Sequence, residues 1–207
     1  LLAMIVAVIE HRYLKSKMAV LPAAVLLVIG IGIFPQIANS GRIQSSDEAF
    51  QTRFERESLY GWVRVIDKPK ENIRLLTVDA STIGAASISH GQNLLTYQKI
   101  VTHIPALVPN MKRALLIGQG AGHMAMTLKE YGIVTDTLEI DPAVAEAASK
   151  FFGFVPTGKA IIGDARYEIR QLKDTYDLVI LDVFTGGSEP THLLTVESLA
   201  QLRGLLS

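Results

Sequence analysis

From residue 112 onward, short apolar strands alternate with helical segments, as they do in α/β folds with a parallel sheet. A glycine-rich turn joins the first of these strands to the first helix, with glycines at Gly118, Gly120 and Gly122. An acid, Glu139, ends the next strand about twenty residues later, a spacing typical of nucleotide-binding sheets. The sequence therefore predicts an α/β, Rossmann-like domain over residues 111–207.

The elements of this domain are predicted from apolar runs and end signals. Asp141 and Pro142 are an N-cap and a first-turn proline, so they begin one helix, and Gly132 ends another. A fourth strand without a further neighbour would be an unpaired edge, so we expect a C-terminally truncated parallel sheet. The strands are expected at residues 114–117, 134–140, 160–162 and 178–181, and the helices at 123–131, 142–152, 167–172 and 196–206.

Residues 58–110 predict a small antiparallel β unit followed by a helix. A turn signal, Asp67-Lys68-Pro69-Lys70, separates the first two strands, and residues 94–107 have helical spacing of their apolar positions. The preceding residues, 42–57, are polar and charged and predict a linker or a short helix. The strands of the β unit are expected at residues 58–66, 73–78 and 85–89.

The composition narrows the classes of function. Lys and Arg together number 20, as do Asp and Glu, so no basic surface indicates a nucleic-acid partner. The sequence contains no cysteine, which excludes disulfides, cysteine–zinc sites and thiol catalysis within it. No cluster of His, Asp and Glu has the spacing of metal ligands, so no metal is expected.

The predicted strand ends converge on one crevice, because ligands of open α/β sheets bind outside the carboxyl ends of the strands. Glu139 can accept hydrogen bonds from both hydroxyls of a ribose. Asp164, followed by Ala165, and Asp182 end the third and fourth strands at the same crevice. His123 stands where a dinucleotide-binding loop has its third glycine. This favours a mononucleoside cofactor of the S-adenosylmethionine type.

The N-terminal residues 1–41 are predicted to be a membrane segment. Residues 18–41 carry no charge, and about 24 residues can cross a hydrocarbon core as one transmembrane helix. Residues 1–9 are apolar but short, and we expect them to be the tail of an earlier helix; a signal peptide is the alternative for the apolar run. Basic residues on both sides leave the orientation undecided. Because an adenosyl cofactor is available in the cytosol, we expect a cytosolic catalytic domain anchored to the inner or plasma membrane.

Nine stretches between residues 57 and 207 carry a family resemblance. They are Glu57-Ser58-Leu59-Tyr60-Gly61, Val63-Arg64-Val65, His90-Gly91-Gln92, Tyr97-Gln98, Leu116-Ile117-Gly118-Gln119-Gly120-Ala121-Gly122, Leu138-Glu139-Ile140-Asp141-Pro142, Gly163-Asp164-Ala165, Leu181-Asp182-Val183-Phe184-Thr185 and Pro190-Thr191-His192-Leu193-Leu194-Thr195. Together they resemble the spermidine synthase (polyamine aminopropyltransferase) family, especially its bacterial membrane-fused members.

The resemblance implies an S-adenosylmethionine-dependent transferase fold that uses decarboxylated S-adenosylmethionine or S-adenosylmethionine as co-substrate. It implies transfer of an aminopropyl group to a small-molecule amine, and pairing of two chains as a homodimer. Asp182 and Tyr97 would be the catalytic residues, and Gln98 would help line the cleft. The cofactor-binding residues would be Gln92, Gly118, Gly120, Gly122, Glu139, Asp164, Ala165 and Asp182.

The sequence departs from this family at three positions that carry acids in authentic synthases. Ala121 lies in the glycine loop, Lys99 follows the Tyr-Gln pair, and Thr185-Gly186-Gly187 follows the fourth strand. In the family, these acids would bind or deprotonate the diamine acceptor. Their replacement therefore affects the expected acceptor chemistry and leaves the expected cofactor binding unchanged. Two alternatives therefore stay open: a methyltransferase on the same fold, and a non-catalytic domain that binds an adenosyl metabolite.

Overall fold

The computed structural model describes residues 50–108, 110–183 and 190–206. The chain divides into two units, Leu1–Ser46 and Asp47–Ser207, and every described residue belongs to the second unit. The predicted membrane segment, residues 1–41, lies outside the described residues. Within the described part of the chain, no helix is long and apolar enough to cross a bilayer.

The first layer of the described unit is a four-stranded antiparallel sheet with the order β1-β2-β3-β4. In β2, buried and partly exposed residues alternate, which places Val63 and Val65 in the core. The strands are β1 (Gln51–Glu57), β2 (Trp62–Lys68), β3 (Ile73–Val78) and β4 (Ser81–Ser87). The third predicted strand thus begins four residues earlier than expected.

Strand β1 corrects the prediction of a linker or short helix over residues 42–57. It pairs with β2 in antiparallel register, from Gln51 opposite Asp67 to Glu57 opposite Trp62. Only Phe54 in β1 is partly buried, and the other residues of the strand are exposed. An edge strand that buries so little has no apolar alternation, so its sequence resembles that of a polar linker.

The predicted helix over residues 94–107 is found as two short pieces, the 3-10 helix η2 (Thr96–His103) and α3 (Ile104–Leu107). Pro105 lies in the first turn of α3 and has no N–H to donate, so it marks the point where the segment changes. Another short 3-10 helix, η1 (Pro69–Glu71), joins β2 to β3 at the predicted turn.

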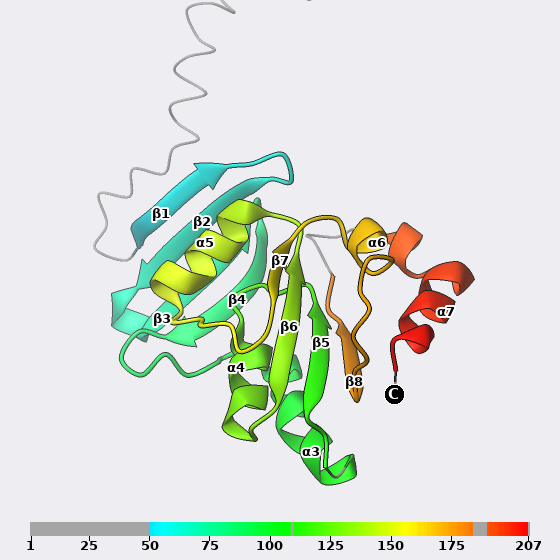
Figure 1. Ribbon diagram of the computed structural model, residues 1–207. Helices are drawn as coiled ribbons and strands as arrows, with labels where there is room; N and C mark the ends of the chain where they lie inside the picture. The colour runs from blue at the N-terminus through cyan, green and yellow to red at the C-terminus, as the bar shows by residue number, and fades with distance from the viewer. Residues whose placement is uncertain (1–49, 109, 184–189, 207) are drawn as a thin grey trace, which may run out of the picture. The chain divides into compact units, whose positions relative to one another are not determined.

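The second layer is a parallel sheet with the order β7-β6-β5-β8, and it confirms the predicted Rossmann-like α/β fold. Figure 1 shows this sheet beside the antiparallel one. The strand order reverses at β5, which lies between β6 and β8, so a crevice is expected at the carboxyl ends of these strands. The strands are β5 (Arg113–Ile117), β6 (Val134–Glu139), β7 (Ala160–Ile162) and β8 (Leu178–Leu181).

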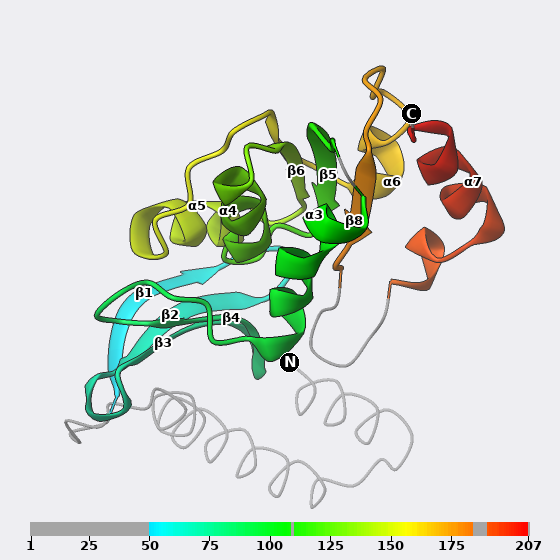
Figure 2. The same cartoon turned by 90° about the horizontal axis from the view of Figure 1, so that it is seen from below.

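Helices cover both faces of the parallel sheet, as Figure 2 shows. Ala114 and Leu116 of β5 pack in the cluster that contains residues of α4, whereas Leu115 and Ile117 pack on the other face, towards α6 and α7. The predicted helix at 167–172 begins two residues earlier, at Ala165. The helices are α4 (His123–Glu130), α5 (Pro142–Phe151), α6 (Ala165–Glu168), η3 (Thr191–Leu193) and α7 (Val196–Gly204).

Helix α5 joins the two sheets. It begins at the predicted N-cap, where Asp141 accepts a hydrogen bond from the Ala143 N–H at 2.8 Å. Its apolar face, including Val144 and Ala147, packs in one cluster with Val63 and Val65 of the antiparallel sheet. This packing brings the antiparallel sheet close to the carboxyl end of β6.

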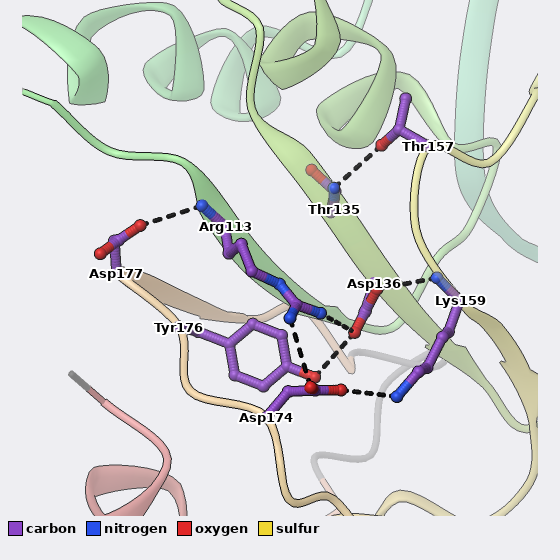
Figure 3. Close-up of polar contacts among 8 residues, drawn as sticks. All are labelled: Arg113, Thr135, Asp136, Thr157, Lys159, Asp174, Tyr176 and Asp177. Carbon is purple, nitrogen blue, oxygen red and sulfur yellow. Dashed lines mark hydrogen bonds and ion pairs between the residues drawn. The ribbon is translucent and has the colours of Figure 1, made fainter.

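A polar cluster closes the opposite, amino-terminal edge of the parallel sheet (Figure 3). The buried carboxylate of Asp136 accepts hydrogen bonds from the Tyr176 hydroxyl at 2.8 Å and from Arg113 at 3.1 Å. Asp174 forms ion pairs with Arg113 at 3.3 Å and with Lys159 at 2.5 Å. Burial, and then the carboxylate of Asp136, raise the pKa of Tyr176 far above its ordinary value. The cluster therefore fixes β5, β6 and the segment before β8 to one another.

Candidate active site

The glycine loop between β5 and α4 is held in a conformation that a side chain could not adopt. Gly118 has a φ of 87°, and a Cβ added there would lie 1.9 Å from the carbonyl oxygen of Asp182. Gly122, the N-cap of α4, has a φ of 82°, and its Cβ would lie 2.3 Å from the ring of Phe154. Both positions therefore require glycine. The first keeps the ends of β5 and β8 together, and the second packs the loop on the core.

Glu139 lies at the carboxyl end of β6, beneath this loop, and its side chain is buried. One carboxylate oxygen accepts hydrogen bonds from the backbone N–H groups of Gln119 at 3.1 Å and Gly120 at 3.2 Å. The other accepts from the Asp141 N–H at 3.1 Å. Burial raises the pKa of Glu139, and the backbone donors partly oppose this change. The carboxylate is thus held in place by the loop that it faces.

Asp164 follows β7 and begins α6. Its carboxylate accepts a hydrogen bond from the Arg166 N–H at 2.7 Å, so it is the N-cap of this helix. Both Asp164 and the buried Ala165 line the pocket described below. The N-cap role and a ligand-binding role are compatible, because a carboxylate has further lone pairs to offer.

Asp182 follows β8 and meets Tyr97 of η2. The Tyr97 hydroxyl donates a hydrogen bond to Asp182 Oδ2 at 3.2 Å. The same hydroxyl accepts a hydrogen bond from Gln98 Nε2 at 3.1 Å. Burial raises the pKa of Asp182, whereas the hydrogen bonds of Tyr97 and Gln98 lower it. Burial also raises the pKa of Tyr97, with a further contribution from the charge of Asp182. The structure thus brings together the two residues that the family resemblance implied to be catalytic.

These groups surround one pocket of about 730 Å³ between the two sheets. None of the described residues that line it is a lysine or an arginine, and four are acids. The lining residues are Tyr60, Val78, Ser81, Thr82, Ile83, Tyr97, Ile117, Gly118, Gly120, Leu138, Glu139, Ile140, Asp141, Val144, Gly163, Asp164, Ala165, Asp182, Val183, Pro190, His192 and Leu193.

Most of the cofactor-binding residues expected from the sequence line this pocket, but Gln92 and Gly122 do not. Gln92 is exposed, and its backbone N–H donates to Ser87 Oγ at 3.2 Å. His123 is buried beside the ring of Phe152, with the ring centroids 5.8 Å apart, and it does not line the pocket either.

The family resemblance implied a cleft between the β unit and the parallel sheet, but the residues that the antiparallel sheet contributes to its wall were not named from the sequence. Tyr60 of the β1–β2 turn and residues 81–83 of β4 line the pocket opposite the strand ends. The Ser58 hydroxyl donates to Asp141 at 2.6 Å and ties this turn to the start of α5. The resemblance of Glu57–Gly61 to the family was the sequence feature that could have indicated a role for Tyr60 at the pocket.

Chemically, the pocket offers carboxylates to cations and hydroxyl groups. Glu139, Asp164 and Asp182 lie at the carboxyl ends of three parallel strands, where ligands of such sheets bind. The apolar residues around them exclude water and strengthen these interactions. No group of three or more His, Asp or Glu side chains in the described part of the chain is placed to hold a metal ion.

A family described as the spermine/spermidine synthase domain matches residues 94–202. An N-terminal histidine N-methyltransferase of Emericella nidulans is 29% identical over 183 residues, which are 78% of this chain and 33% of that protein. A polyamine aminopropyltransferase of Vibrio vulnificus is 39% identical over 106 residues, which are 48% of this chain and 36% of that protein. The chain thus spans about a third of the length of these curated relatives.

Solved structures show the same fold. A spermidine synthase from Thermotoga maritima superposes with a TM-score of 0.62 and 22% identity, covering 76% of this chain and 54% of that one. A spermidine synthase in complex with the transition-state analogue AdoDATO gives a TM-score of 0.60 at 22% identity, covering 76% of this chain and 53% of that one. At this identity the likeness concerns the fold.

Proposed function

The chain belongs to the spermine/spermidine synthase domain family, and we propose that it transfers an aminopropyl group from decarboxylated S-adenosylmethionine to an amine. The observation that carries the proposal is the pocket between the two sheets. It gathers acids from three strand ends and contains no lysine or arginine among its described lining residues. A cationic sulfonium and an amine are the partners that such a pocket favours over anions.

The described residues fit an adenosyl co-substrate. Gly118 and Gly120 line the pocket without side chains, so that a ligand can approach the backbone there. Glu139 would hold the ribose hydroxyls, since a carboxylate can accept hydrogen bonds beyond those of the loop amides. Asp164 would hold the adenine amino group, and Leu138 and Ile140 would pack around the base.

Asp182 would act on the acceptor. When the nitrogen attacks the carbon attached to sulfur, a C–N bond forms, the C–S bond breaks, and methylthioadenosine leaves as a neutral thioether. Asp182 takes the proton that the nitrogen must lose, and Tyr97 holds the carboxylate towards the pocket. Burial raises the pKa of Asp182, which makes its carboxylate a stronger base, and the hydrogen bonds that it accepts keep it ionised.

A methyltransferase is the second candidate, and one observation favours it. The relative that matches 78% of the chain is named an N-terminal histidine N-methyltransferase. The reaction has the same geometry, with intact S-adenosylmethionine as the methyl donor and an amine or imidazole nitrogen as the nucleophile. Ala121 and Lys99, which replace acids of the family, have no bearing on this chemistry. Binding without turnover would indicate the third alternative, a domain that senses an adenosyl metabolite.

The test is product analysis with the full-length protein and each donor in turn. We expect decarboxylated S-adenosylmethionine and an amine to give methylthioadenosine and an amine heavier by one aminopropyl group. A product heavier by one methyl group, formed from the intact donor, would instead establish the methyltransferase. Absence of both products, together with tight binding of methylthioadenosine, would overturn both enzymatic proposals.

We also propose that the protein is attached to the inner or plasma membrane through residues 18–41, with its catalytic part in the cytosol, and that two chains form a homodimer. The membrane proposal is supported by the uncharged length of that segment. The homodimer is supported by the family resemblance alone. Membrane fractionation and light scattering in detergent test the two proposals.

A further inference from the structure

We propose that Asn93 and Gln98 are positioning residues that aim the hydroxyl proton of Tyr97 at Asp182 and so favour the proton-accepting form of this carboxylate. The inference rests on the proposed function, in which Asp182 takes a proton from the amine. Its basis is an unbroken line of hydrogen bonds from Asn93 through Gln98 and Tyr97 to Asp182. We call these four side chains the amide relay.

The backbone sets the direction of the amide relay at its outer end. The Leu95 N–H donates to Asn93 Oδ1 at 2.9 Å, so the other atom of this amide, Nδ2, is the one that faces Gln98. Nδ2 donates to Gln98 Oε1 at 3.1 Å. The amide of Gln98 therefore presents its nitrogen to Tyr97, and an amide nitrogen donates but does not accept.

This direction decides how the Tyr97 hydroxyl is used. The hydroxyl oxygen accepts the Gln98 N–H at 3.1 Å, and its own proton is then free to point to Asp182 Oδ2, 3.2 Å away. An ionised Asp182 accepts this hydrogen bond more strongly than a carboxyl group protonated on Oδ1 would, so the bond favours the ionised form. The relay therefore opposes the burial that raises the pKa of Asp182. It also leaves the second oxygen, Oδ1, for the amine.

The outer part of the relay is fixed by the antiparallel sheet. Asn93 forms an isolated bridge with Ala86 of β4, and the neighbouring Leu94 N–H donates to the Ala85 carbonyl at 2.9 Å. Gln98 is 5% exposed, so water does not compete for its amide. The relay thus connects the edge of β4 to the end of β8, and the antiparallel sheet contributes to the protonation state of an acid on the parallel sheet.

Two substitutions act on the relay in different ways. In Asn93→Asp, one oxygen still accepts the Leu95 N–H but the other cannot donate, so Gln98 reverses and offers its oxygen to Tyr97. Tyr97 then donates to Gln98, and Asp182 loses its hydrogen bond. Gln98→Leu removes both the donor to Tyr97 and the hydrogen bond of Gln98 to Asp182 itself, without adding a charge. Asn110→Asp is the matched control, because it adds the same charge at an exposed turn whose φ of 63° suits aspartate.

The experiment is a pH titration of the Asp182 carboxyl carbon by NMR in the full-length protein, assigned by the loss of its signal in Asp182→Asn. We expect Asp182 to titrate at higher pH in both relay variants and at the wild-type pH in Asn110→Asp. The acidic limb of kcat/KM should move in the same direction, with about tenfold lower activity at neutral pH.

Unchanged titration of Asp182 in relay variants that bind methylthioadenosine as tightly as wild type would overturn the inference. A change in Asn93→Asp but not in Gln98→Leu would also overturn it, because the added charge alone explains that result. If no amine is consumed at any pH, the proposed function fails, whereas the NMR titration still decides whether the relay exists.

Discussion

Acidic side chains lie at both the amino-terminal and the carboxyl-terminal ends of the parallel strands, but the groups that they bind differ between the two ends. At the amino-terminal edge, Asp136 and Asp174 are satisfied by Arg113, Lys159 and the Tyr176 hydroxyl (Figure 3). At the carboxyl-terminal ends of the strands, the acids accept hydrogen bonds from backbone N–H groups and from uncharged side chains such as Ser58 and Tyr97, and no described lysine or arginine lines the pocket.

Strand β6 contains one acid of each kind within four residues. Asp136 is paired with a cation and serves the fold, whereas Glu139 accepts only backbone hydrogen bonds and faces the pocket. Acids that are available to a ligand are therefore distinguished by the absence of a cationic partner rather than by their burial. Both side chains are buried.

The largest effect is expected for Asp182→Asn, which removes the proton acceptor while keeping the shape of the side chain. We expect kcat to fall by a factor of about 10² to 10⁴, the contribution typical of a general base. The affinity for methylthioadenosine should change little, because the amine rather than the nucleoside meets Asp182 in the proposed reaction. Steady-state kinetics and calorimetry measure the two quantities. Full activity in this variant would remove Asp182 from the mechanism.

Glu139→Ala should weaken methylthioadenosine binding by about 100-fold or more. The substitution removes two hydrogen bonds from ribose hydroxyls to an ionised group, each worth about 1.5–3 kcal/mol. It also releases the amides of Gln119 and Gly120 that the carboxylate holds. Isothermal calorimetry tests this expectation, with circular dichroism to establish that the variant is folded. Wild-type affinity in this variant would contradict the proposal that Glu139 holds the ribose hydroxyls.

Asp136→Ala should differ from Glu139→Ala, because we expect it to lower the stability of the protein and to leave the affinity for methylthioadenosine unchanged. The Tyr176 hydroxyl is fully buried and would lose its acceptor, while Arg113 is partly exposed and can be rehydrated. We therefore expect the free energy of unfolding to fall by about 2–3 kcal/mol. Urea denaturation measures it. Asp174→Ala is the control, with a smaller loss because Asp174 pairs with cations near the surface.

Much of the parallel domain could be predicted from the sequence, because its strands are buried apolar runs with clear ends. Strands β5 and β8 lie within one residue of their expected bounds, and Asp141 is the N-cap that was predicted. The antiparallel sheet was harder to predict. Its edge strand β1 buries almost nothing, so it lacks the alternation that indicates a strand.

The site was predictable where it follows from strand ends, as for Glu139, Asp164 and Asp182. The residues contributed by the antiparallel sheet were not predictable, because no local pattern encodes that Tyr60 lines the same pocket as Asp182. Gln92 illustrates the limit of a resemblance. It matches a family motif, yet its side chain does not line the described pocket.

The smallest effect is expected from His123, a buried residue that is neither at the pocket nor in the polar cluster. Burial lowers the pKa of His123, and a backbone contact with Gly91 opposes this in part. The unfolded chain therefore binds a proton more readily, and stability should decline as the pH falls below about 6.5 towards the lower pKa of the folded protein. In His123→Leu this part of the pH dependence should be absent. Thermal denaturation across pH 5–8 tests it, and the same acid dependence in wild type and variant would contradict it.

The most direct measurement is calorimetric binding of methylthioadenosine, decarboxylated S-adenosylmethionine and intact S-adenosylmethionine to the full-length protein. The account predicts binding of all three adenosyl compounds in the pocket that Glu139 lines, with preference for the first two over the intact donor. Preference for the intact donor would identify a methyltransferase instead. Failure to bind any of the three would contradict the central claim that this pocket holds an adenosyl co-substrate.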